Sequence, residues 1–191
     1  MRIAFCGVGA LGSGAAVLCR NLEAIHRYID KDRVESKNLL AQAYVKASIG
    51  KQKAEALKAQ MLNFYSVRAE AFGVSLGRDN VAALLGEADL VVDAFDNLAS
   101  RRVLSTFAEE RGKPLIHAAI AGDGTFGVVR WDERFQPDAE DHEGQATCEG
   151  GAHLPLIGLV SAALARAIQD FVKGAERHDA MVTLGGVQRT Y

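Results

Sequence analysis

The sequence predicts an α/β fold, doubly wound, with a mostly parallel sheet, helices on both of its faces and an antiparallel C-terminal extension. Apolar strand-like runs alternate with helix-like segments over the first two thirds of the chain, which favours parallel strands joined by crossovers. A G-x-G-x-x-G turn, Gly7–Gly12, directly follows the first apolar run. A continuous apolar run over Asp89–Asp93 is typical of a strand covered on both faces. Together these observations indicate a Rossmann-like arrangement.

The first half of the chain is expected to alternate strands with helices. These elements are, in order, the strand Arg2–Cys6, a helix from the glycine turn to about Leu22, the strand His26–Ile29, the helix Lys51–Asn63 and the strand Val67–Phe72. In the second helix, Ala54, Leu57 and Met61 share a face at helical spacing, with Lys53 and Lys58 off that face. This pattern predicts an amphipathic helix that packs on a sheet.

The second half is expected to finish the sheet with antiparallel strands. Its elements are the strand Asp89–Asp93, the helix Leu98–Arg111, the strands Pro114–Ala119 and Thr125–Trp131, the helix Pro155–Lys173 and the strand Met181–Leu184. Gly112 occupies the usual position after a helix, and the short loop before Thr125 favours an antiparallel pair. Residues 132–147 are polar and acidic without periodicity, which predicts a long crossover loop of the kind that is more often functional than accidental.

Length and composition favour a single globular domain and exclude several other classes of protein. The 191 residues suit a single domain, here 1–191, and 49% apolar with 24% charged residues is the balance of a globular chain. A net charge of −2 favours neither nucleic acid nor an anionic membrane as partner. No signal peptide is visible, and the apolar run Leu154–Ala165 is interrupted and shorter than the ~20 residues that a bilayer requires. The three cysteines, Cys6, Cys19 and Cys148, suggest free thiols in a reducing cytoplasm.

The glycine turn predicts a nucleotide site. In a doubly wound sheet, ligands lie at the carboxyl ends of the strands. Gly7, Gly9 and Gly12 permit a tight turn, and the following helix N-terminus attracts phosphate. Asp30 lies 18 residues after Gly12, where a carboxylate accepts hydrogen bonds from ribose hydroxyls. The alternatives are a purely structural turn and a solvated loop acid beside Lys31. These features alone do not separate NAD from ATP.

Further motifs narrow the class of nucleotide-binding protein. From Asp30 the chain reads D-K-D-R-V-E-S-K-N-L-L-A-Q, then I-G-K-Q-K up to Lys53, and D-A-F-D-N from Asp93 to Asn97. With these ordered motifs the chain resembles the ThiF/MoeB/HesA family of bacterial ubiquitin-activating-enzyme-like adenylyltransferases, as a short and divergent member. The resemblance implies binding of ATP and Mg²⁺, and adenylation of the C-terminal glycine of a small ubiquitin-like β-grasp or sulfur-carrier protein. It also implies a homodimer.

The resemblance assigns roles position by position. The residues concerned are Gly7, Gly9 and Gly12 in the phosphate loop, Asp30 at the ribose, Asn38 and Gln42 in the S-N-L-x-R-Q stretch, Lys53 at the phosphates, Asp96 at Mg²⁺ with Asn97 beside it, and Cys148 as a covalent site for the carrier. Each has a plainer alternative. Lys53 can be a solvated helix lysine, Asp96 a helix cap, and Cys148 an unreactive thiol.

Three departures from the family pattern matter. Ala41 replaces the family's phosphate-contacting arginine, and alanine cannot supply charge-assisted contacts. Lys37, Arg33 or a residue of a partner chain are the candidates to replace it. The chain starts at the first strand, without the N-terminal helical segment of typical members, and it has no C-x-x-C pair, so no structural zinc is expected.

Two further functions stay open at this point. Ala41 and the absent N-terminal segment motivate a non-catalytic relative that binds a nucleotide or a carrier protein. The glycine turn and Asp30 alone fit an NAD-dependent oxidoreductase, although Lys53 and the pair Asp96-Asn97 have no evident role there.

Overall fold

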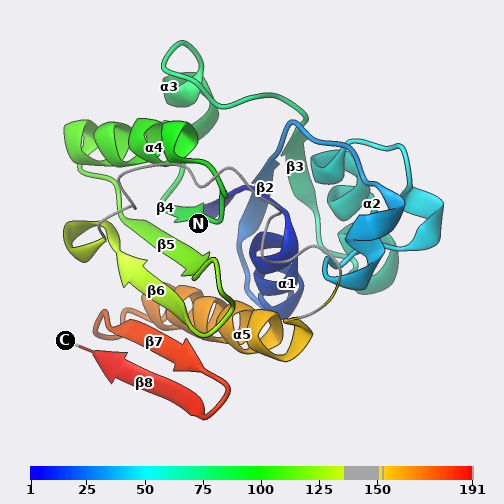
Figure 1. Ribbon diagram of the computed structural model, residues 1–191. Coiled ribbons are helices and arrows are strands. Elements are labelled where there is room, and N and C mark those ends of the chain that lie inside the picture. Colours follow the sequence, from blue (N-terminus) through cyan, green and yellow to red (C-terminus); the bar gives the residue numbers. More distant parts are fainter. Residues whose placement is uncertain (136–150, 152, 191) are drawn as a thin grey trace.

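The computed structural model describes residues 1–135, 151 and 153–190, and these form one eight-stranded sheet in the order β3-β2-β1-β4-β5-β6-β7-β8 (Figure 1). The strands are β1 (Arg2–Cys6), β2 (Ile25–Ile29), β3 (Ala69–Phe72), β4 (Leu90–Asp93), β5 (Leu115–Ile120), β6 (Gly127–Trp131), β7 (Asp179–Thr183) and β8 (Gly186–Thr190). The pairs from β3 to β5 are parallel, and those from β5 to β8 are antiparallel. The predicted fold class is confirmed.

The order of the strands reverses beside β1, which pairs with β2 on one side and with β4 on the other. At such a switch point the connections leave in opposite directions, and a crevice opens beyond the carboxyl ends of the two strands. The crevice therefore lies where β1 leads into the glycine turn and β4 ends at Asp93.

Helices cover both faces of the sheet (Figure 1). They are α1 (Ala10–Leu18), α2 (Lys53–Tyr65), α3 (Val81–Leu85), α4 (Leu98–Arg111) and α5 (Leu154–Val172), with the 3-10 helices η1 (Ser36–Leu40), η2 (Lys46–Ser48) and η3 (Asp132–Arg134). Ile3 and Phe5 of β1 pack in a core with α1, α2 and α5, whereas Ala4 and Cys6 pack in a second core with α3 and α4. Alternate side chains of one buried strand thus serve two cores.

Some elements differ from expectation. The first helix ends at Leu18 instead of about Leu22, and α3 and β8 were not predicted. Helix α3 has five residues, too few for a helical period to show, and most of β8 is exposed and polar, so it lacks alternation. The expected acidic loop begins as the 3-10 helix η3, while residues 136–147 lie outside the described part of the chain.

Helix α5 is longer than its first apolar run suggested. It has 19 residues with a mean hydropathy of 1.4, so among the described helices it is the one with the length and composition to cross a membrane. The expectation that this segment is too short is therefore wrong. Seven buried residues form one of its faces, and Ser161 lies close against Gly14 of α1. Because core helices of soluble proteins share these features, the length and apolarity are weak evidence for a membrane span.

Candidate functional site

A polar cleft lies at the switch point of the sheet and gathers residues from five parts of the chain. Its lining consists of Gly7, Gly9, Asp30, Lys31, Asp32, Lys53, Val74, Ser75, Leu76, Ala94, Phe95, Asp96, Asn97 and Ser100. The glycines follow β1, the acidic and basic residues follow β2 or begin α2, and the D-N pair follows β4. Six of the residues selected from the sequence therefore share one cleft.

The three glycines of the turn have different reasons to be glycine. Gly7 has a φ of +80°, and a Cβ there would lie 2.8 Å from the carbonyl oxygen of Ala94. A Cβ on Gly12 would lie 2.0 Å from the carbonyl oxygen of Gly7. A Cβ on Gly9 would meet no atom within 4 Å. Packing of the described residues thus explains Gly7 and Gly12, whereas Gly9 faces open space in the cleft.

Asp30 is a buried carboxylate, not a solvated loop acid. It is 6% exposed, and its Oδ2 accepts a hydrogen bond from the backbone N–H of Val8 at 2.9 Å, while Oδ1 accepts one from Asp32 N–H at 2.9 Å. Burial raises the pKa of the Asp30 carboxyl, against the opposing effects of Lys53 and of these backbone donors. The side chain thereby ties the end of β2 to the glycine turn.

Lys53 is the first residue of α2, where a cation opposes the helix dipole. Its side chain is 10% exposed, and Nζ lies 3.1 Å from Asp32 Oδ2. Lys58 on the same helix is 42% exposed and pairs with Glu55, so the interpretation of Lys53 as an equivalent solvated lysine is wrong. Sequence analysis did not select Asp32, although the D-K-D spacing places it two residues after the buried Asp30.

Asp96 and Asn97 have separate local roles. The Oδ1 atom of Asn97 accepts a hydrogen bond from Ser100 N–H at 2.9 Å and caps α4. The alternative in which Asp96 caps this helix is therefore wrong. Asp96 is exposed and lines the cleft, which leaves its carboxylate available to a ligand.

The donor set of the cleft suits only certain metal ions. Among the described residues, no group of three or more His, Cys, Asp or Glu side chains is placed to hold a metal. Mg²⁺ is usually bound through one or two carboxylates together with water and substrate phosphates. A single exposed carboxylate such as Asp96 fits an ion that arrives with a triphosphate, and it does not fit a dedicated protein cage.

Besides Gly12, two described residues selected from the sequence lie outside the cleft lining. Asn38 is buried in η1, and its Oδ1 accepts a hydrogen bond from Glu35 N–H at 2.8 Å, so it closes a local turn. Gln42 has a buried Oε1 that has no hydrogen-bond partner among the described residues. Neither candidate to replace the family arginine, Arg33 or Lys37, lines the cleft, whereas Lys31 does.

The cleft is narrow. It encloses about 60 Å³, well below the roughly 300 Å³ at which pockets for small ligands begin. A larger hollow of about 370 Å³ lies between α5 and the strands β6 to β8, and it shares no lining residue with the cleft. A whole nucleotide therefore requires the cleft to open.

The cysteines divide into two groups. Cys6 ends β1 and Cys19 follows α1, and both are buried free thiols. Burial raises the pKa of Cys19 to about 12 and also raises that of Cys6, so both are protonated and unreactive at neutral pH. Cys148 lies outside the described residues, and its covalent role stays a prediction.

Comparison with known sequences identifies relatives along almost the whole chain. The family model described as the ThiF family matches residues 1–188. A sulfur carrier protein adenylyltransferase of Thermus thermophilus is 40% identical over 119 residues, which cover 59% of this chain and 44% of the relative. The adenylyltransferase and sulfurtransferase UBA4 of Lodderomyces elongisporus is 30% identical over 176 residues, which cover 86% of this chain and 38% of the relative. The chain spans less than half the length of these relatives.

Solved structures share the fold. Escherichia coli MccB, solved with ATP, superimposes with a TM-score of 0.80 at 16% identity, over 99% of this chain and 62% of that one. PaaA superimposes with a TM-score of 0.77 at 19% identity, over 99% of this chain and 63% of that one. At these identities the likeness establishes the fold and its strand order.

Proposed function

The chain belongs to the ThiF family, and on that premise we propose that it is an ATP-dependent adenylyltransferase that activates the C-terminal glycine of a ubiquitin-like sulfur-carrier protein. The observation that carries the proposal is the cleft at the switch point, which unites Gly9, Asp30, Lys53 and Asp96. Curated relatives are named as sulfur carrier protein adenylyltransferases, which supports this class of substrate.

The proposed reaction joins two anions. A carboxylate oxygen of the carrier's terminal glycine attacks the α-phosphorus of ATP, the bond to pyrophosphate breaks, and an acyl adenylate and pyrophosphate result. Because like charges must approach, the site has to screen them. Lys53 is held beside the cleft by Asp32, at 3.1 Å, and would stay in place while it contacts the phosphates.

The remaining residues would position the nucleotide. The open space at Gly9 admits a phosphate close to the backbone, where the N-terminus of α1 offers N–H donors. Each oxygen of Asp30 already accepts one backbone hydrogen bond and keeps a lone pair for a ribose hydroxyl. Asp96, in the same cleft, would hold Mg²⁺, which would supply charge neutralisation at the phosphates.

Lys31 is the proposed replacement for the family arginine. Ala41 ends η1 and carries no charge, whereas Lys31 is exposed and lines the cleft together with Lys53. A lysine supplies a mobile point charge without the bidentate geometry of a guanidinium. Replacing Lys31 with Ala is therefore expected to weaken ATP binding, while replacing Lys37 with Ala leaves it unchanged.

The test is ATP–pyrophosphate exchange. Radiolabelled pyrophosphate should enter ATP only when the purified protein, Mg²⁺ and a β-grasp carrier with a C-terminal Gly-Gly are all present. A carrier that lacks its terminal glycine is the control, because it removes the reacting carboxylate and keeps the docking surface. Absence of exchange with every carrier encoded near the gene would overturn the proposal.

A second function is favoured by two observations. Ala41 removes a phosphate contact, and the cleft of about 60 Å³ encloses only part of a nucleotide. Both suit a relative that binds a carrier protein or a nucleotide without catalysis. Calorimetry that shows ATP binding, combined with no AMP or pyrophosphate in the presence of a carrier, would select this function.

The proposed active form is a homodimer, on family membership. Light scattering of the purified chain at several concentrations tests it directly. A mass of about twice 20.5 kDa is expected, and a monomer at every concentration would contradict the dimer without bearing on the nucleotide cleft.

A further inference from the structure

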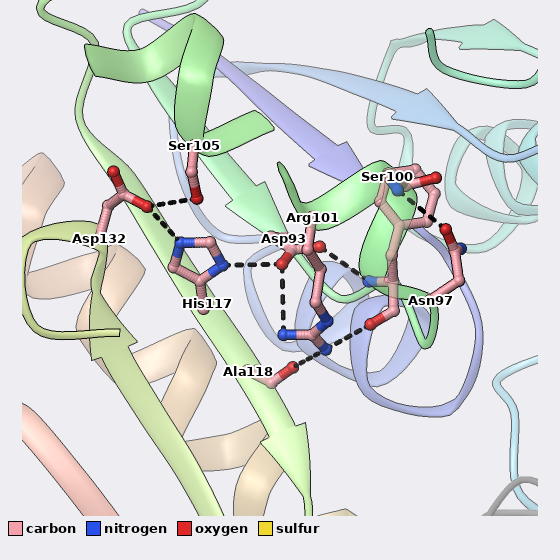
Figure 2. A network of polar contacts seen from close by, with 9 residues as sticks. Asp93, Asn97, Ser100, Arg101, Ser105, His117, Ala118 and Asp132 are labelled. Carbon is pink, nitrogen blue, oxygen red and sulfur yellow. Dashed lines mark hydrogen bonds and ion pairs between the residues drawn. The ribbon is translucent and has the colours of Figure 1, made fainter. Parts of the chain in front are cut away.

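A buried polar network lies behind the cleft and links the strands β4 and β5 to the helices α4 and η3 (Figure 2). His117 of β5 is fully buried between two carboxylates. Its Nδ1 lies 2.7 Å from Oδ2 of Asp93, at the end of β4, and its Nε2 lies 2.8 Å from Oδ1 of Asp132, the first residue of η3. Sequence analysis did not select His117, because it is a lone histidine in an apolar strand.

The contacts determine the number of protons on the ring. A neutral imidazole has one N–H donor and one acceptor nitrogen, whereas an ionised carboxylate only accepts. Asp132 Oδ1 also accepts a hydrogen bond from Ser105 Oγ at 2.7 Å, and Asp93 Oδ2 lies 3.3 Å from the guanidinium of Arg101. With both carboxylates ionised, both ring nitrogens must donate a hydrogen bond. The two negative charges of the carboxylates are then balanced by the positive charges of His117 and Arg101.

The surroundings of the ring keep this arrangement in place. Phe135 stacks on His117 with centroids 4.0 Å apart and an interplanar angle of 9°, and Arg101 lies over the ring of Phe135. Among the described residues, Cys6 of β1 faces Asp93, and Arg130 of β6 is opposite His117 in the strand register. Stacking and burial limit the access of water to the two hydrogen bonds.

The network also holds the loop that carries Asp96. Asp93 Oδ1 accepts a hydrogen bond from Phe95 N–H at 2.9 Å, and Arg101 donates to the carbonyl oxygens of Phe95 and of Ala118. Both backbone polar groups of Phe95 are therefore bound to the side chains that His117 organises. Phe95 directly precedes Asp96, so the network sets the path of the backbone into the cleft.

We propose that His117 is an imidazolium at neutral pH in the folded protein and acts as a positioning residue. It holds Asp93 and Asp132 so that Arg101 and Asp93 keep the Phe95–Asn97 loop in the geometry that adenylation requires. The role of His117 in catalysis rests on the proposed function. The charge state of His117 and the order of the Phe95–Asn97 loop do not depend on that function. His117 touches no substrate; it acts through Asp93.

The pKa directions agree with the geometry. Burial works to lower the pKa of His117, but the hydrogen bonds to Asp132 and Asp93 outweigh it, and the pKa is raised. The hydrogen bond from His117 is the largest influence on Asp132 and lowers its pKa. His26 on β2 is equally buried but has no carboxylate partner in the described part of the chain, and burial lowers its pKa to about 4.

The first experiment uses His26 as an internal reference. In ¹⁵N-histidine-labelled protein, NMR at neutral pH should show both ring nitrogens of His117 protonated, and His26 as a neutral ring. Assignment comes from the spectra of His117→Gln and His26→Gln. A neutral His117 at neutral pH would overturn the proposal, and this measurement on the unmodified chain does not depend on whether a variant folds.

The second experiment measures the order of the loop by hydrogen exchange at a fixed pH. His117→Gln should accelerate amide exchange of Phe95–Asn97 about tenfold, because hydrogen bonds between a cation and two carboxylates are replaced by weaker ones from a neutral amide. Ser105→Ala is the matched control: it removes one hydrogen bond from a neutral donor to Asp132 and keeps the imidazolium, so its effect should be about twofold. Unchanged exchange in His117→Gln would contradict the positioning role.

A third experiment, on the pH dependence of catalysis, distinguishes a failure of the positioning role of His117 from a failure of the proposed function. If pyrophosphate exchange occurs, its kcat should fall as the pH rises through the His117 pKa measured by NMR, with little change in KM for ATP, and His117→Gln should lose that alkaline decline. An active enzyme with a neutral His117 defeats this inference alone. An inactive protein that retains the imidazolium and the ordered loop defeats the proposed function instead.

Discussion

Asp30 and Val8 are joined by a hydrogen bond of 2.9 Å from the Val8 backbone N–H to the Asp30 carboxylate. This contact connects the end of β2 to the turn after β1, two segments that are 22 residues apart in the chain. The acid that the sequence suggests for ribose binding therefore also supports the glycine turn. A structural role and a proposed binding role therefore fall on one side chain.

Asp30→Ala is expected to destabilise the protein as well as to remove nucleotide binding. The substitution leaves the buried N–H of Val8 without its acceptor, at a cost of about 1–3 kcal/mol. Urea unfolding measures this loss in the absence of ligand. Asp30→Asn keeps one acceptor oxygen and should lose less stability, and equal stability of Asp30→Ala and the unmodified protein would contradict the structural role.

Gly9→Ala and Gly12→Ala should affect different properties: Gly12→Ala the stability of the fold, and Gly9→Ala the binding of ATP. A Cβ on Gly12 would lie 2.0 Å from a backbone oxygen, so Gly12→Ala should lower the free energy of unfolding by about 1–3 kcal/mol. Gly9→Ala meets open space and should remain within about 1 kcal/mol of the unmodified protein. Calorimetry should nevertheless show weaker ATP binding for Gly9→Ala, and undiminished binding would place the phosphates elsewhere.

Lys53→Ala is expected to reduce ATP affinity about tenfold or more, because a charge-assisted contact in a largely buried position is lost. Lys58→Ala is the matched control, since Lys58 lies on the same helix but is 42% exposed and pairs with Glu55. Both affinities should be measured by calorimetry at one ionic strength. Equal affinities for the two variants would refute the role of Lys53.

Asp96→Ala should abolish Mg²⁺-dependent pyrophosphate exchange without loss of stability, because Asp96 is exposed. Asn97→Ala removes the cap of α4 and should lower the free energy of unfolding by about 1 kcal/mol. Thermal unfolding and exchange assays on both variants test the pair. Normal turnover by Asp96→Ala would show that the metal is held by other groups.

The two buried histidines should give stability profiles of opposite sign. The folded pKa of His26 is about 4, below its ordinary value of 6.5. As the pH falls from 6.5 toward 4, the unfolded chain therefore binds a proton that the folded protein does not, and the free energy of unfolding falls. His26→Gln should weaken this acid decline in urea-unfolding midpoints, and an unchanged slope would contradict it.

For His117 the folded pKa is raised above 6.5. Its contribution to stability is fully present below the unfolded pKa and is lost as the pH rises through the folded pKa. The same unfolding measurements, continued to alkaline pH, should show a decline that His117→Gln lacks. If the alkaline decline in the free energy of unfolding persists unchanged in His117→Gln, another titratable group causes it.

Local patterns in the sequence were sufficient to predict most of the strands and helices of the fold. The alternation of strands and helices predicted the parallel half of the sheet, the helix Leu98–Arg111 matches α4 at both ends, and the antiparallel β6 was expected from its short connection. These features depend on residues near each other in the chain, where side-chain periodicity and turn residues act directly. The mostly exposed edge strand β8 and the five-residue α3 carry no such period.

The composition of the cleft was also partly accessible from the sequence. Gly7, Asp30, Lys53 and Asp96 follow strand ends or begin helices, and strand ends of a doubly wound sheet converge at one edge. By contrast, three features depend on side-chain directions. These are the pairing of Lys53 with the exposed Asp32, the burial of Lys53, and the presence of Lys31 in the cleft in place of Arg33 or Lys37.

The sequence by itself thus determined the fold class, the position of the ligand crevice and most of the residues around it, because hydrophobic periodicity and turn chemistry act over short distances along the chain. Only the tertiary structure decided which charges meet. Asp93, His117 and Asp132 come from three separate elements, and they meet through contacts below 3 Å. Such contacts depend on strand register and helix packing, which no local pattern in the chain encodes.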